Sequence, residues 1–349
     1  METQQTQQTQ QTQQTQQAQQ TEPRASAELS AQIDESSTAL SMVREEVGRR
    51  VVGQRDMIDG MLIGIVAGGH VLLEGVPGLA KTMAIKALSE VINAGFRRIQ
   101  FTPDLLPADL IGTMVYCQQT GEFAARKGPV FSNIILADEI NRAPAKVQSA
   151  LLEAMEERQV TIGDTTFRLP EPFFVLATQN PIEQEGTYPL PEAQLDRFVL
   201  KLAVQYPSPE EELAILRRVG VEQQIPVNAV LGPDEIALLR RTAAAVSVDE
   251  RIEEYIVRLV TASREQNKNV HTYSRYIEFG ASPRASIYLY RAAKVRALFD
   301  GRHYVVPEDV KAVAPAVLRH RIILSYEAES EELTADDVVH YLLSAIPVP

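Results

Sequence analysis

The chain has 349 residues, of which 45% are hydrophobic, and its formal net charge is -12 at pH 7. The length and apolar content suit about two domains with packed cores, whereas the acidic balance argues against broad nucleic-acid binding, which uses a basic face. The single cysteine, Cys117, excludes an internal disulfide and a cysteine-based metal site, and a cytoplasmic location is expected.

The N-terminal region shows no catalytic pattern. Residues 1–26 repeat Thr-Gln-Gln and hold almost no apolar side chains, so a disordered tail is predicted. The start lacks the pattern of a signal peptide. The most apolar window, "MLIGIVAGGHVLL" from Met61, is too short for a membrane span and is broken by Gly68 and Gly69. It predicts a helix, a glycine stop and a strand, and no membrane insertion is expected.

The stretch "GVPGLAKT", Gly75 to Thr82, follows the phosphate-binding P-loop pattern except for Ala80, where the pattern has its second glycine. A P-loop needs a strand before it and a helix after it, so that backbone N–H groups and the helix dipole face the phosphates. "HVLLEG" predicts that strand, and Lys81 to Ile92 predicts the helix. The apolar face expected for this helix consists of Met83, Ala84, Ala87, Leu88 and Val91. A strand–helix turn with a surface lysine is the alternative.

An acidic pair follows in "NIILADEINRAP", which begins at Asn133. The apolar strand 134–137 delivers Asp138 and Glu139 to its carboxyl end, which is the edge where open α/β sheets bind ligands. Asp138 suits Mg²⁺ together with the Thr82 hydroxyl. Glu139 suits the orientation or deprotonation of an attacking water. The alternative is a helix N-cap, a position that acids favour.

Three later motifs add polar groups. "FFVLATQNP" predicts a buried strand ending in Asn180, whose amide can position the same water. Arg197 in "PEAQLDRFVL" precedes a last strand. In "FGASPRAS", Ser282 is expected as N-cap, Pro283 at the first helical position and Arg284 in the first turn. A cation there opposes the helix dipole, so Arg284 is expected to face an anion, although either arginine alone is more often part of a salt bridge.

The chain divides into a tail and two domains. Strands and helices alternate over residues 27–205, which predicts an α/β domain with a parallel sheet and helices on both faces. "YPSPEEE" from Tyr206 marks a linker, and residues 206–349 predict a smaller all-α lid domain. "ERQVTIGDTTFRLP", residues 157–170, predicts a β-hairpin with Asp164 at its turn.

The order of "GVPGLAKT", "ADEINRAP", "ATQNP", "LPEAQLDRF" and "GASPRA" closely resembles AAA+ ATPases, and specifically the MoxR family. The resemblance covers roughly Val43 to Ile322 and makes Ala80 a family trait. It implies an AAA+ ATPase core followed by a helical lid, with ATP and Mg²⁺ bound. The region from Phe101 to Phe131 resembles the insertion near helix 2 of related proteins, and residues 157–170 resemble their pre-sensor-1 hairpin.

The resemblance also implies roles for single residues. Asn180 corresponds to sensor 1, Arg197 to the arginine finger and Arg284 to sensor 2, and Thr82 and Asp138 are the metal ligands. The catalytic residues implied are Lys81, Glu139, Asn180, Arg197 and Arg284. The nucleotide-binding residues implied are Val52, Gly53, Gly75, Val76, Pro77, Gly78, Leu79, Ala80, Lys81, Thr82, Met83 and Asp138. Val52 and Gly53 belong to "VVGQ", Val51 to Gln54, which matches the family segment that lines the adenine. Less directly, Gln100 is implied to couple partner binding to Glu139.

The motifs and the resemblance imply a homo-oligomeric ring, expected to be hexameric, that hydrolyses ATP and remodels or matures partner protein complexes as a chaperone does. The expected partners are a von Willebrand factor A domain protein and a protein client. The main alternative is a nucleic-acid-translocating AAA+ motor, which fits poorly because the hairpin presents Asp164 and the insertion has one compact basic pair, Arg126-Lys127. The second alternative is a small-molecule P-loop kinase. It would need neither an arginine from a neighbour nor a helical lid that places Arg284, so these two features argue against it.

Overall fold

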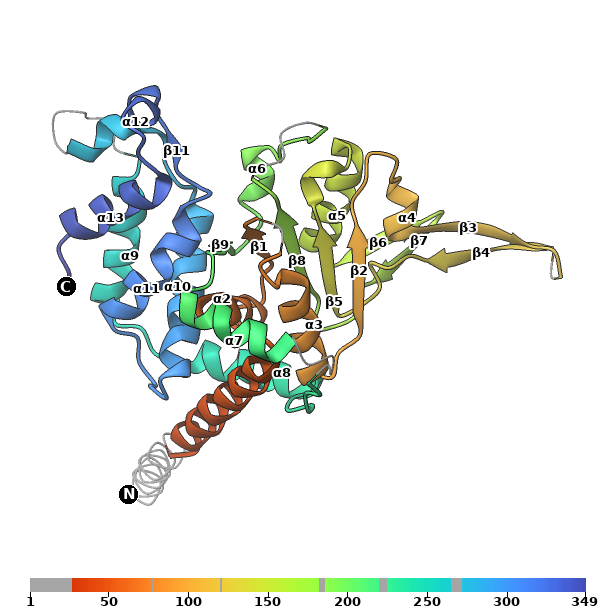
Figure 1. Ribbon diagram of the computed structural model, residues 1–349, viewed down its shortest axis with the longest axis horizontal. Helices are drawn as coiled ribbons and strands as arrows, with labels where there is room; N and C mark the ends of the chain where they lie inside the picture. Colours follow the sequence, from red (N-terminus) through yellow and green to blue (C-terminus); the bar gives the residue numbers. More distant parts are fainter. Residues whose placement is uncertain (1–26, 77, 120, 182–185, 220–224, 265–271) are drawn as a thin grey trace, which may run out of the picture.

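The computed structural model describes residues 27–349 except residues 77, 120, 182–185, 220–224 and 265–271. The predicted tail over 1–26 and one predicted site residue, Pro77, lie outside the described residues. Figure 1 shows an α/β part, a helical part beside it, and a two-stranded arm that projects from the α/β part. Among the described residues, no helix is long and apolar enough to cross a membrane.

The centre of the α/β part is a five-stranded sheet in the order β2-β5-β8-β1-β9, and all of its paired strands are parallel. Its strands are β1 (Val71–Glu74), β2 (Phe96–Gln100), β5 (Ile134–Asp138), β8 (Phe174–Gln179) and β9 (Leu200–Ala203). Because the strands are parallel, their carboxyl ends lie at one edge of the sheet. In this strand order, β1 before the P-loop, β8 before Asn180 and β5 before the acidic pair are neighbours.

Helices cover both faces of this sheet, as the sequence predicts. Alternate residues of β1 enter different cores: Val71 and Leu73 pack with the first, and Leu72 packs with the second. The first core includes residues of a helix over 27–50, of α2 and of α3, and the second includes residues of α4 and α5. The helices and the 3-10 turn of this part are α2 (Arg55–Val66), α3 (Lys81–Val91), α4 (Pro107–Ile111), η1 (Ile140–Arg142), α5 (Ala145–Glu157) and α6 (Glu192–Leu195).

Two β-hairpins extend from the sheet. The predicted hairpin is formed by β6 (Gln159–Ile162) and β7 (Thr165–Arg168), with Gly163 and Asp164 at its turn. The projecting arm is formed by β3 (Gly112–Cys117) and β4 (Glu122–Lys127), within the region that resembles an insertion. The two hairpins are in contact: Gly163, at the turn of one, lies against the Met114 side chain of the other.

The remainder is mainly helical. Its helices are α7 (Pro209–Val219), α8 (Pro233–Ala245), α9 (Glu250–Ala262), η2 (Thr272–Tyr276), α10 (Pro283–Phe299), α11 (Pro307–Leu318), α12 (Tyr326–Ser330) and α13 (Ala335–Ala345). One short antiparallel pair, β10 (Ile277–Phe279) with β11 (Ile323–Leu324), adds a β element to the lid predicted as all-α. Strands this short carry no readable alternation. The predicted domain boundary after residue 205 stays a prediction, because Leu62 and Leu239 share one core cluster across it.

Candidate active site

The P-loop joins β1 to α3. Gly78 has φ 87° and Ala80 has φ 57° with ψ 16°, so two left-handed residues turn the chain into the helix. Ala80 therefore carries a backbone cost of roughly 1–2 kcal/mol that glycine would avoid. Lys81 begins α3, and its Nζ donates a hydrogen bond to the Gly75 carbonyl across 2.6 Å. The amino end of α3 and this ammonium form the positively polarised cradle that phosphate binding requires.

The buried face of α3 matches the predicted face only in part. Met83 is 36% exposed, whereas Ala84, Ala87, Leu88 and Val91 are buried as expected. Ile85 is buried as well. Met83 lies in the first helical turn, next to the loop, where the core does not reach it. Its side chain is therefore exposed next to the P-loop. Its predicted place among the nucleotide-binding residues stays a prediction.

The acidic pair lies at the same edge of the sheet as the P-loop. Asp138 ends β5 and Glu139 follows it, while β8 separates β5 from β1. Burial lowers the pKa of the Lys81 ammonium, and the carboxylates of Asp138 and Glu139 oppose that shift. The structure thus brings Lys81, Asp138 and Glu139 into one electrostatic group. Asn180, directly after β8, is 5% exposed and lies at this edge between the two motifs.

Asp138 is held by two residues that the sequence motifs did not single out. The Thr178 hydroxyl donates to Oδ1 across 2.7 Å, and Arg98 donates to Oδ2 from Nε across 3.0 Å and from Nη2 across 2.6 Å. The Arg98 side chain is half exposed, so a solvent-accessible cation already stands beside this carboxylate. A carboxylate that attracts the Arg98 cation can also attract Mg²⁺, which prefers oxygen ligands. Mg²⁺ needs only one or two protein ligands, because phosphates and waters complete its coordination shell. Asp138 supplies such an oxygen, and the pairing of Thr82 with it as a metal ligand stays a prediction.

Glu139 occupies a constrained position. Its φ is 56°, and its N–H donates to the Thr178 hydroxyl across 2.8 Å. Its Oε2 accepts a hydrogen bond from Nε2 of Gln100 across 2.8 Å and lies 3.4 Å from Nη1 of Arg142. Gln100 ends β2, the neighbour of β5, which explains how it reaches Glu139. The sequence already singled out Gln100, whereas Thr178 is an ordinary strand residue in "ATQNP" and gave no signal.

Arg197 and Arg284 converge on a different place. Arg197 Nη1 lies 2.7 Å from Oε2 of Glu156, and Arg284 Nη2 lies 3.0 Å from Oε1 of the same carboxylate. Ser282 caps α10 and accepts a hydrogen bond from the Arg284 N–H, as predicted. The expectation that Arg284 faces an anion is met by Glu156, in the form of a salt bridge.

The two arginines lie at the opposite edge of the sheet from the P-loop. They line a cavity of about 150 Å³ together with Gly68, Gly69 and His70, which precede β1. The P-loop follows β1, and the four residues of that strand span roughly 13 Å. The structure therefore does not bring Arg197 and Arg284 to the P-loop of their own chain.

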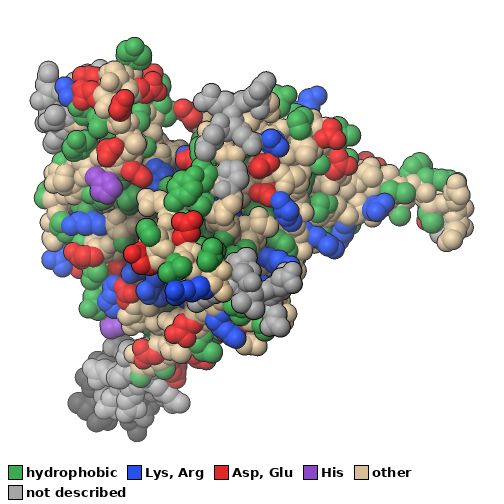
Figure 2. All heavy atoms as spheres, viewed as in Figure 1, with side chains coloured by type: hydrophobic (Ala, Val, Ile, Leu, Met, Phe, Trp, Pro, Cys, Tyr) green, Lys and Arg blue, Asp and Glu red, His purple; other side chains and the backbone are tan. Residues whose placement is uncertain are grey.

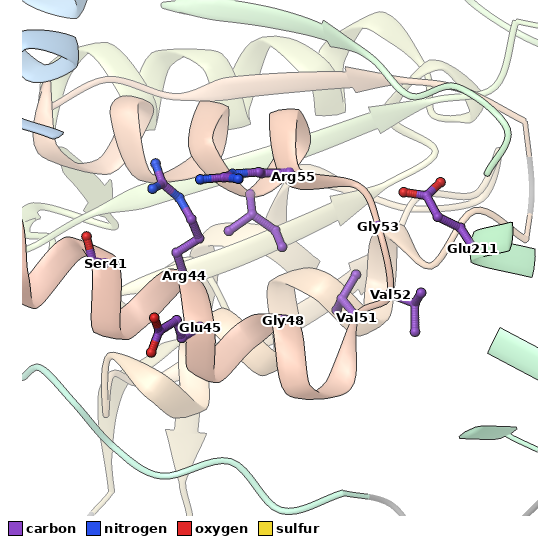
Figure 3. Close-up of a pocket in the computed structure, with 10 residues that line it drawn as sticks. Ser41, Arg44, Glu45, Gly48, Val51, Val52, Gly53, Arg55 and Glu211 are labelled. Carbon is purple, nitrogen blue, oxygen red and sulfur yellow. The ribbon is translucent and has the colours of Figure 1, made fainter. Parts of the chain in front are cut away.

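The predicted adenine segment lines a separate cavity of about 630 Å³ (Figure 3). Val52 and Gly53 form one side of it, Arg55 lies at the start of α2, and Glu211 approaches from α7. Gly53 has φ 65°, a backbone conformation in which a side chain would be strained, and a Cβ there would also displace the Glu211 carboxylate. The cavity has no lining residue from the described part of the P-loop, and the adenine assignment stays a prediction.

These features define a class of protein. A parallel sheet carrying a P-loop and an acidic pair at one edge, followed by a helical lid, is the architecture of a P-loop ATPase. Family models agree: residues 70–200 match the ATPase family associated with various cellular activities (AAA), and residues 272–341 match the AAA lid domain.

Relatives narrow the class. Chaperone MoxR1 of Mycobacterium tuberculosis is 50% identical over 87% of this chain and 81% of its own length. Protein MoxR of Methylorubrum extorquens is 31% identical over 91% of this chain and 98% of its own length. A crystal structure from Cytophaga hutchinsonii, provisionally assigned as an ATPase, shares 50% identity and superposes with a TM-score of 0.86, covering 94% of this chain and 99% of the other. The chain belongs to the MoxR family of AAA+ ATPases.

Proposed function

We propose that the protein hydrolyses ATP to ADP and phosphate as an oligomeric ATPase, and that it uses this reaction to remodel or mature partner protein complexes. The observation that carries the proposal is the meeting of Lys81, Asp138 and Glu139 at one sheet edge. The membership of a family of ATPases supports the reaction class, and the name of the 50% identical relative, a chaperone, supports the kind of work.

The residues divide the chemistry between them. Lys81 and the amino end of α3 hold the phosphates of ATP, and Asn180 positions the attacking water. Thr82 and Asp138 would hold Mg²⁺, which when bound neutralises charge on the phosphates. Glu139 accepts the proton of the water once its carboxylate is released from Gln100. Val52 and Gly53 hold the adenine side of the nucleotide.

The place of the two arginines supports an oligomer. Arg197 and Arg284 lie across the sheet from their own P-loop, so we infer that both act on ATP held by a neighbouring subunit. An arginine supplied by a neighbour is worth about 10³–10⁵ in rate. Each subunit then has one P-loop edge and one arginine edge. A head-to-tail arrangement of this kind gives a ring when the rotation between neighbours closes, and a hexamer is the ring that the family resemblance favours.

The projecting arm supports a protein client. Figure 2 shows hydrophobic side chains toward the end of the arm. Val115, Tyr116 and Phe123 are 41%, 53% and 67% exposed, and the two aromatic rings lie 5.3 Å apart. Exposed apolar side chains of this kind mark protein contacts. A von Willebrand factor A domain partner and a cytoplasmic location are proposed on the family resemblance alone.

A nucleic-acid motor has less support. In the basic pair of the arm, Lys127 directs its Nζ over the rings of Phe131 and Phe167, 4.9 Å from each centroid. That ammonium is committed to an internal contact. Asp164 at the turn of the other hairpin would repel phosphates.

ATP hydrolysis measured against protein concentration, beside sedimentation velocity, tests the proposal. Specific activity should rise as subunits associate. Lys81→Ala should abolish ATP binding, Glu139→Gln should bind ATP without turnover, and Lys86→Ala, an exposed lysine of the same helix, should leave both intact. Arg197→Ala should bind ATP but hydrolyse it about 10³-fold or more slowly. Normal kcat for Arg197→Ala at assembling concentrations would refute the action in trans.

A mixing experiment separates the two sites. Arg197→Ala and Lys81→Ala are each inactive, but a mixed assembly places an intact Lys81 beside a neighbour with an intact Arg197. Some turnover should therefore return on mixing. DNA or RNA added at low salt should not stimulate hydrolysis, and stimulation by either would favour the nucleic-acid motor.

A further inference from the structure

One carboxylate serves both arginines. Glu156, near the carboxyl end of α5, binds Arg197 through Oε2 at 2.7 Å and Arg284 through Oε1 at 3.0 Å. The Glu156 side chain is 39% exposed, and the cavity beside it opens toward solvent. Two guanidinium groups that converge on two oxygens of one anion have the arrangement with which arginines bind a phosphate group.

A third arginine lines the same cavity without a counter-ion. Arg291 lies on α10 at the face that carries Arg284 and Tyr288, because positions 284, 288 and 291 follow the helical spacing of four and three residues. It is exposed, and within the described chain it has no hydrogen bond or ion pair. Arg158, which also lines the cavity, differs: it donates to the Gly68 carbonyl and pairs with Glu171, so its contacts lie within the subunit.

We propose that Arg197, Arg284 and Arg291 form a receptor for the terminal phosphate of ATP held by the neighbouring subunit, in which Arg291 is a third phosphate-binding cation and Glu156 is an internal competitor for that phosphate. The inference rests on the proposed function and extends it to two residues outside the motifs. One carboxylate carries a single charge, whereas a terminal phosphate carries more charge and three acceptor oxygens. The phosphate therefore satisfies three guanidinium groups where Glu156 reaches two.

The competition fixes the sign of each substitution. Asp196 Oδ2 also lies 3.6 Å from Nη1 of Arg284 and helps to hold that arginine in place. Removing the Glu156 charge removes the one anion that Arg197 and Arg284 share, so phosphate binding should tighten. Removing Arg291 takes away a phosphate contact and breaks no hydrogen bond or ion pair among the described residues. If Glu156 instead held the arginines in their working position, its removal would weaken the same binding.

Inorganic triphosphate binding, measured by calorimetry at low salt, tests the receptor directly. The Lys81→Ala protein is used so that the P-loop does not contribute. In this background Glu156→Gln should tighten binding about two- to tenfold, in keeping with the loss of two solvent-exposed ion pairs. Arg291→Ala should weaken it by a similar factor, and Arg291→Lys should weaken it less because the charge remains without the fork. Glu153→Gln on α5 and Arg258→Ala on α9 are matched controls that should change nothing.

Turnover at assembling concentrations gives the second measurement. With Lys81 intact, Arg291→Ala should lower kcat about tenfold or more, and Glu156→Gln should lower the ATP concentration at which assembly is half complete. Weaker triphosphate binding by Glu156→Gln, or unchanged binding by Arg291→Ala, would overturn the inference even if the wild type is an active oligomer. Equal loss of assembly by Arg291→Ala with and without ATP would make it an ordinary subunit contact. A wild type that neither assembles nor hydrolyses ATP would refute the proposed function, whereas the triphosphate measurement still reports on the cavity.

Discussion

Gln100 holds the carboxylate of Glu139 through a hydrogen bond of 2.8 Å from Nε2 to Oε2. The two residues stand at the ends of the adjacent strands β2 and β5, and β2 is followed by the chain that leads to α4 and the projecting arm. A client that displaces the arm can therefore shift Gln100, because only a short stretch of backbone joins the two. The carboxylate that accepts this bond is less free to take a proton from water.

The first prediction follows from that restraint. Gln100→Leu should raise basal kcat about two- to tenfold, which corresponds to about 0.4–1.4 kcal/mol, the size of the net contribution of a typical hydrogen bond. Steady-state hydrolysis without client is the measurement, and the midpoint of urea unfolding should stay close to that of the wild type. A fall in kcat toward the level of Glu139→Gln would show that Gln100 holds the base in its working position.

The second prediction concerns Thr178, whose hydroxyl donates to Asp138 Oδ1 and accepts from the Glu139 N–H. Thr178→Val keeps the shape but leaves a half-buried N–H and a carboxylate oxygen without this partner. The free energy of unfolding should fall by about 1–3 kcal/mol, and Mg²⁺-dependent turnover should fall with it. Thr178→Ser retains the hydroxyl and is the control. Equal stability for the valine and serine variants would mean that the two hydrogen bonds contribute nothing net.

The candidate site shows which of its residues could be predicted from one sequence and which could not. The P-loop, the acidic pair and the capped arginine were all predicted, because each depends on local order: a strand end, a loop and a helix start. Thr178 and Arg98 were not, since a threonine or arginine in a strand is ordinary until the register places it beside Asp138. Glu156 gave no signal for the same reason: its partners lie 41 and 128 residues later in the sequence. The position of Arg284 relative to the P-loop likewise depends on packing.

The third prediction separates the hairpin from the chemistry. Asp164 lies at the turn between β6 and β7, away from the strand ends that hold Asp138 and Asn180. Asp164→Lys should leave basal ATP hydrolysis within about twofold of the wild type while altering stimulation by a protein client. Hydrolysis with and without client is the readout. Loss of basal activity as complete as that of Lys81→Ala would place the hairpin in the active site.

The fourth prediction is a pH dependence. His70 is buried; its Nδ1 accepts from the Val175 N–H at 3.0 Å and its Nε2 lies 3.2 Å from the Met155 carbonyl. Burial lowers the pKa of His70 to about 3. The unfolded chain takes up this proton near pH 6.5, so the stability that the neutral ring supports is present above pH 6.5. It is lost as the pH falls toward 3, by up to about 1.4 kcal/mol per pH unit.

Urea unfolding between pH 7 and 4 measures this effect. The wild type should lose stability more steeply than His70→Asn, in which the amide oxygen can replace Nδ1 as the acceptor and no group titrates. The asparagine variant should be less stable at pH 7, so the comparison concerns the two slopes. Parallel slopes would show that His70 does not contribute to acid sensitivity.

The last prediction concerns the segment that carries Arg197. Buried Arg321 donates from Nε to Oδ1 of Asp196 at 2.8 Å and from Nη2 to the Asp196 carbonyl at 2.9 Å. The other oxygen of Asp196 accepts from Ser282, the N-cap residue of α10, at 2.9 Å. Asp196 therefore ties Arg197 to the helix that presents Arg284. Burial lowers the pKa of Arg321, and the Asp196 carboxylate opposes that shift.

Asp196→Asn preserves the size of the side chain and removes its charge. A buried guanidinium that loses its carboxylate should destabilise the protein by about 3–5 kcal/mol, and Asp196→Glu should recover part of this. Both arginines then lose their common support, so kcat should fall at least tenfold in protein that remains folded, whereas KM for ATP should change little because the P-loop lies at the other sheet edge. Steady-state kinetics below the unfolding temperature separates the two parameters. A raised KM with unchanged kcat would instead connect Asp196 to nucleotide binding within its own subunit, and would contradict the separation of the two edges on which action in trans depends.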